Sequence, residues 1–190
     1  MNLPNKLTVA RVAMIPIFLF FFFAGFIPWN YFIALLVFTA AAVTDSIDGK
    51  IARERGLVTD FGKLMDPLAD KLLVMSAMVS LIPLGMIHAA IVVVILAREF
   101  MVTAIRQLAA GKGIVIAADG AAKLKTIFQM IWICYDLAFL FAERNLQIIP
   151  AILAAPVQVL HYVLIVCVLA LTGFSGINYL WKNRGLFADA

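Results

Sequence analysis

The chain has 190 residues, of which 65% are hydrophobic and 14% are charged, and its formal net charge is +4. Soluble domains usually contain about 45–50% apolar and about 25% charged residues, so this chain carries more apolar surface than one soluble core buries. Its 15 Phe, 3 Trp and 4 Tyr exclude an intrinsically disordered chain. The two cysteines lie in apolar stretches, which argues against a disulfide framework or a zinc site. The composition therefore indicates an integral membrane protein.

Six apolar stretches are long enough to cross a bilayer as helices, which takes about 20 residues each. The short segment before the first stretch mixes Leu3 and Leu7 with Asn2, Asn5 and Lys6, and we expect it to lie along the membrane surface. No linker, internal repeat or low-complexity segment interrupts the chain. We expect an all-α fold with six transmembrane helices in a single domain, residues 1–190. The expected spans are Val9–Phe26, Trp29–Ile47, Leu64–Leu84, Ile87–Leu108, Leu124–Phe141 and Ile149–Leu171.

The basic residues predict how these spans are oriented. Of the 15 Lys and Arg residues, 14 lie near the chain ends or near the second-to-third and fourth-to-fifth connections, whereas Arg144 alone lies in an opposite connection. By the positive-inside rule, this asymmetry places both termini in the cytoplasm. The net positive charge then reflects topology and contact with anionic lipid, and it gives no reason to expect nucleic-acid binding.

Six of the 11 acidic residues fall between Asp45 and Asp70. Asp45 and Asp48 end the second stretch, Asp66 and Asp70 begin the third, and spacings of three and four residues place each pair on one helix face. Four converging carboxylates either take up protons or bind cations. Oxygen ligands favour Mg²⁺, Mn²⁺ or Ca²⁺ over zinc. Taken singly, each aspartate is equally consistent with a helix cap, as Asp60 is, or with a partner for a nearby Lys or Arg.

The residues around these aspartates suit a phosphate-bearing ligand. Gly49 and Gly62 lack side chains, so a ligand can approach the backbone there. Ala52 is small, and the planar guanidinium of Arg53 matches phosphate oxygens. Carboxylates, metal ions and an arginine together indicate a diphosphate site.

These residues form the pattern D-x2-D-G-x2-A-R-x8-G-x3-D-x3-D from Asp45 to Asp70. It matches every fixed position of the signature of the CDP-alcohol phosphatidyltransferases, and the chain resembles that family along nearly its whole length. The resemblance implies the CDP-alcohol phosphotransferase fold, a homodimer, and transfer of a phosphatidyl group from CDP-diacylglycerol to an alcohol with release of CMP. It further implies a two-metal site for Mg²⁺ or Mn²⁺ held by Asp45, Asp48, Asp66 and Asp70, with Asp70 also as the general base. The implied nucleotide and diphosphate contacts are Asp45, Gly49, Ala52, Arg53 and Gly62.

A glycerophosphate acceptor needs cations near the aspartates. Ionisable residues inside spans are functional candidates, and we expect the acceptor phosphate to contact Arg98, Arg106, Lys123 and Lys125. The two lysines could instead extend to lipid headgroups. Because Arg98 and Glu99 are adjacent, we do not expect them to neutralise each other on one helix face.

Three secondary motifs resemble bacterial members of the family that use sn-glycerol 3-phosphate. They are Asn2 to Thr8, Arg98 to Arg106, and Lys123 to Met130. The same pattern leaves phosphatidylglycerol, serine and inositol phosphate open as acceptors. The resemblance implies an enzyme of the bacterial cytoplasmic membrane, with its active site on the cytoplasmic side.

Two other classes of protein stay open. A cation-coupled transporter would also have intramembrane charges, although here the acids cluster at one membrane surface. A structural scaffold would not need the cluster. His88, His161 and Asp136 have no functional assignment, and Asp119 is placed to cap the fifth helix.

Overall fold

The computed structural model describes the backbone of residues 3–54, 60–111, 113, 114, 116, 120–146 and 151–184. Within these ranges, the side chains of residues 3–7, 45–54, 60–64, 66, 67, 70, 146 and 151–154 lie outside the described part. All four signature aspartates belong to this second group, so their helices are described but their carboxylates are not.

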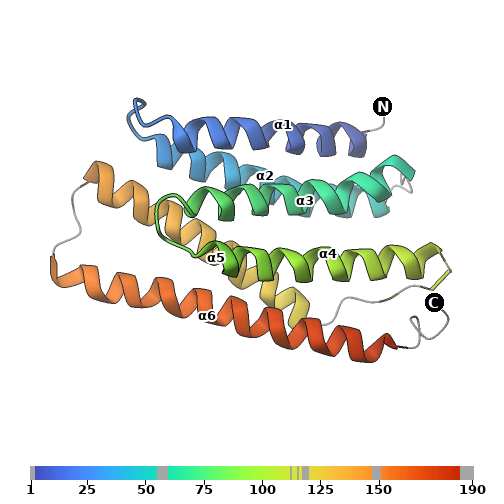
Figure 1. Cartoon of the computed structure of the whole chain (residues 1–190). Coiled ribbons are helices and arrows are strands. Elements are labelled where there is room, and N and C mark those ends of the chain that lie inside the picture. Colours follow the sequence, from blue (N-terminus) through green and yellow to red (C-terminus); the bar gives the residue numbers. More distant parts are fainter. Residues whose placement is uncertain are drawn as a thin grey trace. The chain divides into compact units, whose positions relative to one another are not determined.

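All regular structure in the described ranges is helical, which confirms the all-α expectation (Figure 1). A five-residue π-helical turn, Ala142–Leu146, follows the fifth helix. The six α-helices are α1 (Leu3–Phe23), α2 (Asn30–Glu54), α3 (Asp60–Leu81), α4 (Ala89–Gly111), α5 (Gly120–Phe141) and α6 (Ala151–Lys182).

The largest differences from the expected spans are at the start of α1 and at the ends of α2 and α6; α2 ends at Glu54, beyond the expected Ile47. The N-terminal segment is not separate, because α1 begins at Leu3 and continues through it. Pro4 does not break this helix, since the first turn needs no backbone N–H donor. Helix α6 ends at Lys182, well beyond the expected Leu171. Its last turns contain polar residues, and these lowered the apolar signal used to predict its end.

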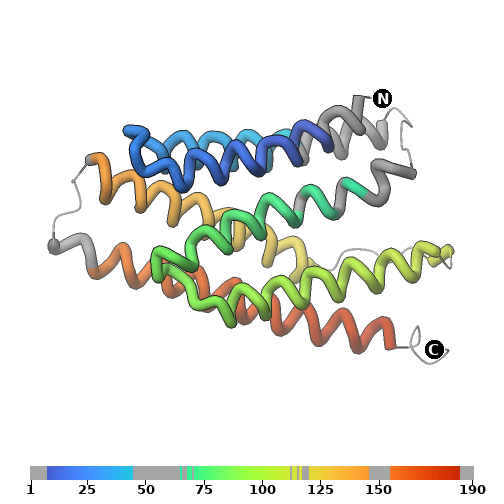
Figure 2. Tube along the Cα trace, turned by 45° about the horizontal axis from the view of Figure 1, so that its top comes forward, coloured from blue at the N-terminus to red at the C-terminus, as the bar shows by residue number. Residues whose placement is uncertain are grey.

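The helices form two compact units. Unit 1 comprises Met1–Met86 and Ile133–Ile152 and contains α1, α2, α3 and the end of α5. Unit 2 comprises Ile87–Trp132 and Leu153–Ala190 and contains α4, the start of α5 and nearly all of α6. Figure 2 colours the described parts of each along the chain. The single domain expected from the sequence remains a prediction.

In unit 1, α1 packs against both α2 and α3. Phe18 and Phe38 are fully buried, and their ring centroids lie 6.0 Å apart. Ala34 and Ala41, also fully buried, flank Phe38 on α2 and allow a close helix approach. Asn30 donates from Nδ2 to the carbonyl of Phe22 at 3.1 Å, which satisfies one of the last carbonyls of α1.

In unit 2, α4 and α6 run side by side in the same direction (Figures 1 and 2). The buried face of α4 repeats every three or four residues, as an amphipathic helix requires. This face includes a charged residue, Arg98, among aliphatic ones; it consists of Val92, Ile95, Arg98, Val102, Ile105 and Ala109.

Glycine ends α4 in unit 2. Gly113 has φ 73°, the left-handed conformation that glycine adopts without steric cost. Its N–H donates to the carbonyl of Ala110 at 3.0 Å, and the N–H of Ile114 donates to that of Ala109 at 2.8 Å. This pair of bonds is a Schellman motif, which stops the helix by satisfying its last carbonyls.

Two segments of the described chain are long and apolar enough to cross a membrane, Gly120–Asn145 and Ala155–Lys182. Shorter apolar helices cover Thr8–Phe23, Asn30–Thr44 and Lys71–Leu81. Large apolar side chains also point outward, among them Val163, Val166, Phe174, Ile177 and Trp181 on α6. An exposed apolar surface of this extent is typical of a protein that contacts lipid. The chain is therefore associated with a membrane.

Candidate functional site

The signature aspartates lie at matching positions on α2 and α3. Asp48 precedes the end of α2 at Glu54 by six residues, and Asp66 follows the start of α3 at Asp60 by six. With a rise of 1.5 Å per residue, both positions are about 9 Å from the helix ends that residues 55–59 connect. Asp45 and Asp70 are about one turn further along their helices. The backbone thus brings the two pairs to similar depths, while their carboxylates lie outside the described residues.

A buried arginine on α1 accompanies these positions in unit 1. Arg11 is only 3% exposed, as is Thr8, one turn earlier on the same helix face. The ring contact between Phe18 and Phe38 sets the register of the antiparallel pair α1 and α2. Arg11 precedes Phe18 by seven residues and Asp45 follows Phe38 by seven, so Arg11 is about level with the Asp45 position. The sequence had suggested only that Arg11 marks membrane orientation.

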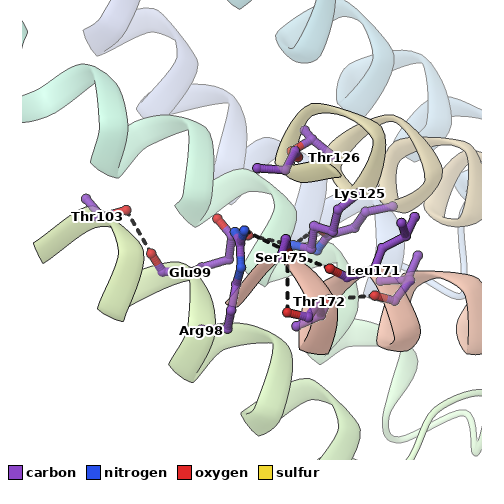
Figure 3. A network of polar contacts seen from close by, with 11 residues as sticks. Arg98, Glu99, Thr103, Lys125, Thr126, Leu171, Thr172 and Ser175 are labelled. Carbon is purple, nitrogen blue, oxygen red and sulfur yellow. Dashed lines mark hydrogen bonds and ion pairs between the residues drawn. The ribbon is translucent and has the colours of Figure 1, made fainter. Parts of the chain in front are cut away.

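The second group of charged residues is a buried network in unit 2 (Figure 3). Glu99 Oε1 accepts from Arg98 Nη1 at 3.0 Å and from Lys125 Nζ at 2.6 Å. Lys125 also donates to Gln129 Oε1 at 2.5 Å, and Arg98 Nη2 donates to Ser175 Oγ at 2.8 Å. One carboxylate oxygen therefore joins cations of α4 and α5, and Ser175 ties Arg98 to α6.

This geometry corrects one expectation. Arg98 and Glu99 do form an ion pair, although neighbouring residues point about 100° apart on a helix. The long Arg98 side chain bends toward Glu99 while Ser175 holds its other terminal nitrogen. Lys125 is fully buried, so it does not extend to lipid headgroups.

Two cations share one carboxylate in this network. Arg98 and Lys125 both pair with Glu99, which is the one acidic residue among the described residues of unit 2. Moreover, Arg98 Nε is buried and makes no hydrogen bond within the described part of the chain. Buried donors are normally paired, so this N–H suits an anion.

The other two candidate cations stand apart from this network. Arg106 lies two helical turns beyond Arg98 on α4, with its guanidinium carbon 5.6 Å from the ring centroid of Tyr179. Arg106 Nε and Tyr179 Oη are both buried and make no hydrogen bond among the described residues. Lys123 is exposed. The structure therefore joins Arg98 with Lys125, and it does not bring Arg106 or Lys123 into the same network.

Sequence reasoning missed three members of this network: Glu99, Gln129 and Ser175. Gln129 follows Lys125 by four residues, so helical spacing could have revealed it. Ser175 lies 77 residues from Arg98, and no local pattern predicts which residue of α6 faces that arginine.

The structure shows where the polar residues lie to which the sequence analysis gave no function. His88 Nδ1 accepts from the N–H of Ala90 at 3.2 Å, which caps the start of α4. His161 is largely buried and its ring lies 5.1 Å from that of Tyr162. Asp136 is fully buried within α5. The predicted cap at Asp119 lies outside the described residues.

The sequence profile of the CDP-alcohol phosphatidyltransferases matches residues 1–174. The chain belongs to this family. A CDP-diacylglycerol–glycerol-3-phosphate 3-phosphatidyltransferase of Bacillus subtilis is 45% identical over 141 residues, covering 68% of this chain and 73% of the relative. A relative of the same name from Rickettsia bellii is 41% identical over 129 residues, covering 68% of this chain and 71% of the relative. A probable phosphatidylglycerophosphate synthase of Mycobacterium tuberculosis is 35% identical over 180 residues, covering 94% of this chain and 79% of the relative.

Membership in the CDP-alcohol phosphatidyltransferase family confirms the resemblance seen in the signature. It also identifies the chain as an enzyme, which argues against the transporter and scaffold alternatives.

Proposed function

We propose that this phosphatidyltransferase transfers the phosphatidyl group of CDP-diacylglycerol to sn-glycerol 3-phosphate, giving phosphatidylglycerophosphate and CMP. The names of its relatives support both substrates. The geometric observation that carries the acceptor is the pair of buried cations, Arg98 and Lys125, with the Nε of Arg98 making no hydrogen bond among the described residues. A glycerophosphate brings a negatively charged phosphate, whereas serine alone does not.

The aspartate positions form the proposed site for the diphosphate of CDP-diacylglycerol. Four aspartates, at backbone positions of similar depth on α2 and α3, offer the oxygen donors that suit Mg²⁺ or Mn²⁺. Asp45, Asp48, Asp66 and Asp70 would hold two such ions. When bound, the ions would supply Lewis-acid stabilisation for the negative charge on the diphosphate and on departing CMP. Gly49, Ala52, Arg53 and Gly62 are the proposed nucleotide and diphosphate contacts.

Arg11 belongs to the same proposed site. A guanidinium in an apolar layer is stable only beside negative charge, and its helical register places it at the level of Asp45. A planar guanidinium also binds two phosphate oxygens at once. We assign Arg11 as a ligand of the phosphates of CDP-diacylglycerol. Thr8 lies on the same face of α1.

In the proposed reaction, the protein orients the acceptor and removes its proton. Arg98 and Lys125 hold the acceptor phosphate, and Arg106 and Lys123 stand nearer the ends of α4 and α5 as further candidates for guiding it. Asp70 takes the proton from the attacking hydroxyl. That oxygen forms a bond to the lipid-bearing phosphorus, and the bond from this phosphorus to the CMP oxygen breaks.

The substrates also require a site that is open both to the lipid bilayer and to water. The diacylglycerol chains stay in the bilayer, whereas glycerol 3-phosphate arrives from water. We propose six membrane-spanning helices in a bacterial cytoplasmic membrane, with both termini and the active site on the cytoplasmic side, as the basic residues predict. A homodimer is part of this proposal.

The test is CMP release by purified protein given CDP-diacylglycerol and Mg²⁺ or Mn²⁺. Glycerol 3-phosphate, phosphatidylglycerol, serine and inositol 1-phosphate are supplied in separate reactions. Release that needs both the metal and glycerol 3-phosphate supports the proposal. Release with another alcohol alone would leave the family assignment intact and would contradict glycerol 3-phosphate as the acceptor.

A further inference from the structure

We propose that Glu99 is a positioning residue of the acceptor site: its carboxylate sets the places of Arg98 and Lys125 without itself binding the substrate. This inference rests on the proposed function, because it assigns the acceptor phosphate to these two cations. The inference rests on the network of Figure 3, in which polar side chains of three helices meet.

One oxygen atom of Glu99 holds both cations. Both cations donate to the same atom, Glu99 Oε1, at 3.0 Å and 2.6 Å. A single oxygen shared in this way fixes the separation of a guanidinium and an ammonium from different helices. Lysine loses much side-chain freedom when it is held, so a preplaced Lys125 lowers the entropic cost of binding an anion.

The charges of the network also point to Glu99. A fully buried ammonium is stable only beside a counter-charge, and Lys125 forms an ion pair with Glu99. The same carboxylate oxygen also pairs with Arg98. Glu99 is therefore a counter-charge that the two cations have in common.

Glu99 itself is a poor ligand for the acceptor phosphate. A carboxylate repels a phosphate, so direct binding of that phosphate by Glu99 is unfavourable. The effect of Glu99 on the phosphate therefore passes through Arg98 and Lys125. Removing Glu99 should then weaken acceptor binding less when Lys125 is absent.

The experiment compares Glu99→Gln, Lys125→Met and the double variant in reconstituted membranes, with KM measured separately for each substrate. Gln keeps an acceptor oxygen but removes the charge. We expect Glu99→Gln to raise the KM for glycerol 3-phosphate about tenfold, with the KM for CDP-diacylglycerol within twofold of wild type. In the Lys125→Met background, Glu99→Gln should raise this KM only about threefold, because one of the two cations that Glu99 positions is gone.

The control variant is Thr103→Val. Thr103 Oγ1 donates at 2.8 Å to the backbone carbonyl of Glu99 and not to its carboxylate. This change alters α4 near Glu99 while leaving the shared oxygen in place, so both KM values should stay within twofold of wild type.

Equal rises in both KM values, or effects of Glu99→Gln and Lys125→Met that multiply, would overturn the proposal in favour of a general structural role. If Glu99→Gln fails to fold, Glu99→Asp gives the answer. Asp keeps the charge but is one methylene shorter, so it cannot reach both cations and should also raise the acceptor KM. A wild-type acceptor KM in Glu99→Asp would also overturn the proposal.

The wild-type reaction separates this inference from the proposed function. If wild-type protein uses a different phosphate-bearing alcohol, the acceptor assignment fails, and the same variants still test Glu99 with that alcohol. If wild-type protein uses only an acceptor without phosphate, both proposals fall.

Discussion

Gly176 on α6 packs directly against the aliphatic stem of Arg98 on α4. A Cβ atom at position 176 would lie 3.2 Å from Arg98 Cγ, closer than most real Cβ contacts. The absent side chain lets α6 approach Arg98 near the Ser175 hydroxyl that binds its guanidinium. The position of this guanidinium thus depends on a glycine that carries no polar group of its own.

We therefore expect Gly176→Ala to shift Arg98 and to raise the KM for glycerol 3-phosphate about threefold to tenfold. The KM for CDP-diacylglycerol should stay within twofold of wild type. Both constants come from CMP release at varied concentrations of one substrate.

Gly173→Ala is the matched control. It makes the same exchange one turn earlier on α6, where an added Cβ meets nothing within 4 Å. Alanine also favours the helix equally at both positions, by about 1 kcal/mol. A similar kinetic effect of the two substitutions would contradict the role of Gly176.

Substitutions of Asp70 and Asp66 should impair different steps, turnover in the first case and binding of CDP-diacylglycerol in the second. Asp70→Asn removes the proposed base but keeps an oxygen donor, so turnover should fall about 10²–10⁴-fold while CDP-diacylglycerol still binds. Asp66→Ala removes a proposed metal ligand, so metal-dependent binding of CDP-diacylglycerol should be lost. Turnover and equilibrium binding of the nucleotide lipid distinguish the two cases.

Asp60→Asn is the control for both, because it exchanges a carboxylate at the first residue of α3, at a variable position of the signature. Asn caps a helix as well as Asp does, so stability and turnover should match the wild type. Normal turnover of Asp70→Asn would remove Asp70 as the base.

Arg11 should affect the nucleotide lipid and not the acceptor. Arg11→Met keeps the apolar packing of α1 but removes the cation at the level of Asp45. We expect the KM for CDP-diacylglycerol to rise about tenfold, equivalent to about 1.4 kcal/mol, with the acceptor KM unchanged. Arg11→Lys should recover part of the loss, since it keeps the charge without the bidentate fork.

Lys182→Met serves as the comparison, because it removes a cation from the exposed end of α6. If Arg11→Met and Lys182→Met behave alike, Arg11 contributes only to orientation in the membrane.

The sequence predicted the parts of this protein that depend on local pattern. Six apolar stretches of about 20 residues predicted six helices, and the described residues contain six α-helices. The spacing of Asp45, Asp48, Asp66 and Asp70 gave the signature and hence the family.

Contacts between distant helices could not be predicted in the same way. Helical periodicity defines a face of α4, but it does not define which residue of α6 meets Arg98 or how deeply Arg11 is buried. Those depend on the register between helices, which is set by packing such as that of Phe18 on Phe38. The contacts that join Arg98, Glu99, Lys125 and Ser175 could therefore be recognised only in the structure.

Arg144 illustrates the same limit within unit 1. From the sequence it is an exception to the charge asymmetry, whereas in the structure its guanidinium donates to the carbonyl of Gly25 and lies 5.7 Å from the ring centroid of Tyr31. Next to it, Asn145 Oδ1 accepts from the N–H of Trp29 at 3.3 Å, and Trp29 adopts the left-handed φ of 65°. Such a φ is strained for a bulky residue, so this contact helps to hold the turn between α1 and α2.

Arg144→Met should therefore lower the Tm of the purified protein by several degrees, because it removes a charged hydrogen bond and a cation–π contact together. Neither KM should change more than twofold, since these contacts involve none of the proposed site residues. Glu143→Gln, at the neighbouring exposed position, should leave Tm unchanged. Asn145→Ala should also lower Tm, because Trp29 then loses its partner. A wild-type Tm for both Arg144→Met and Asn145→Ala would show that these contacts do not stabilise the turn.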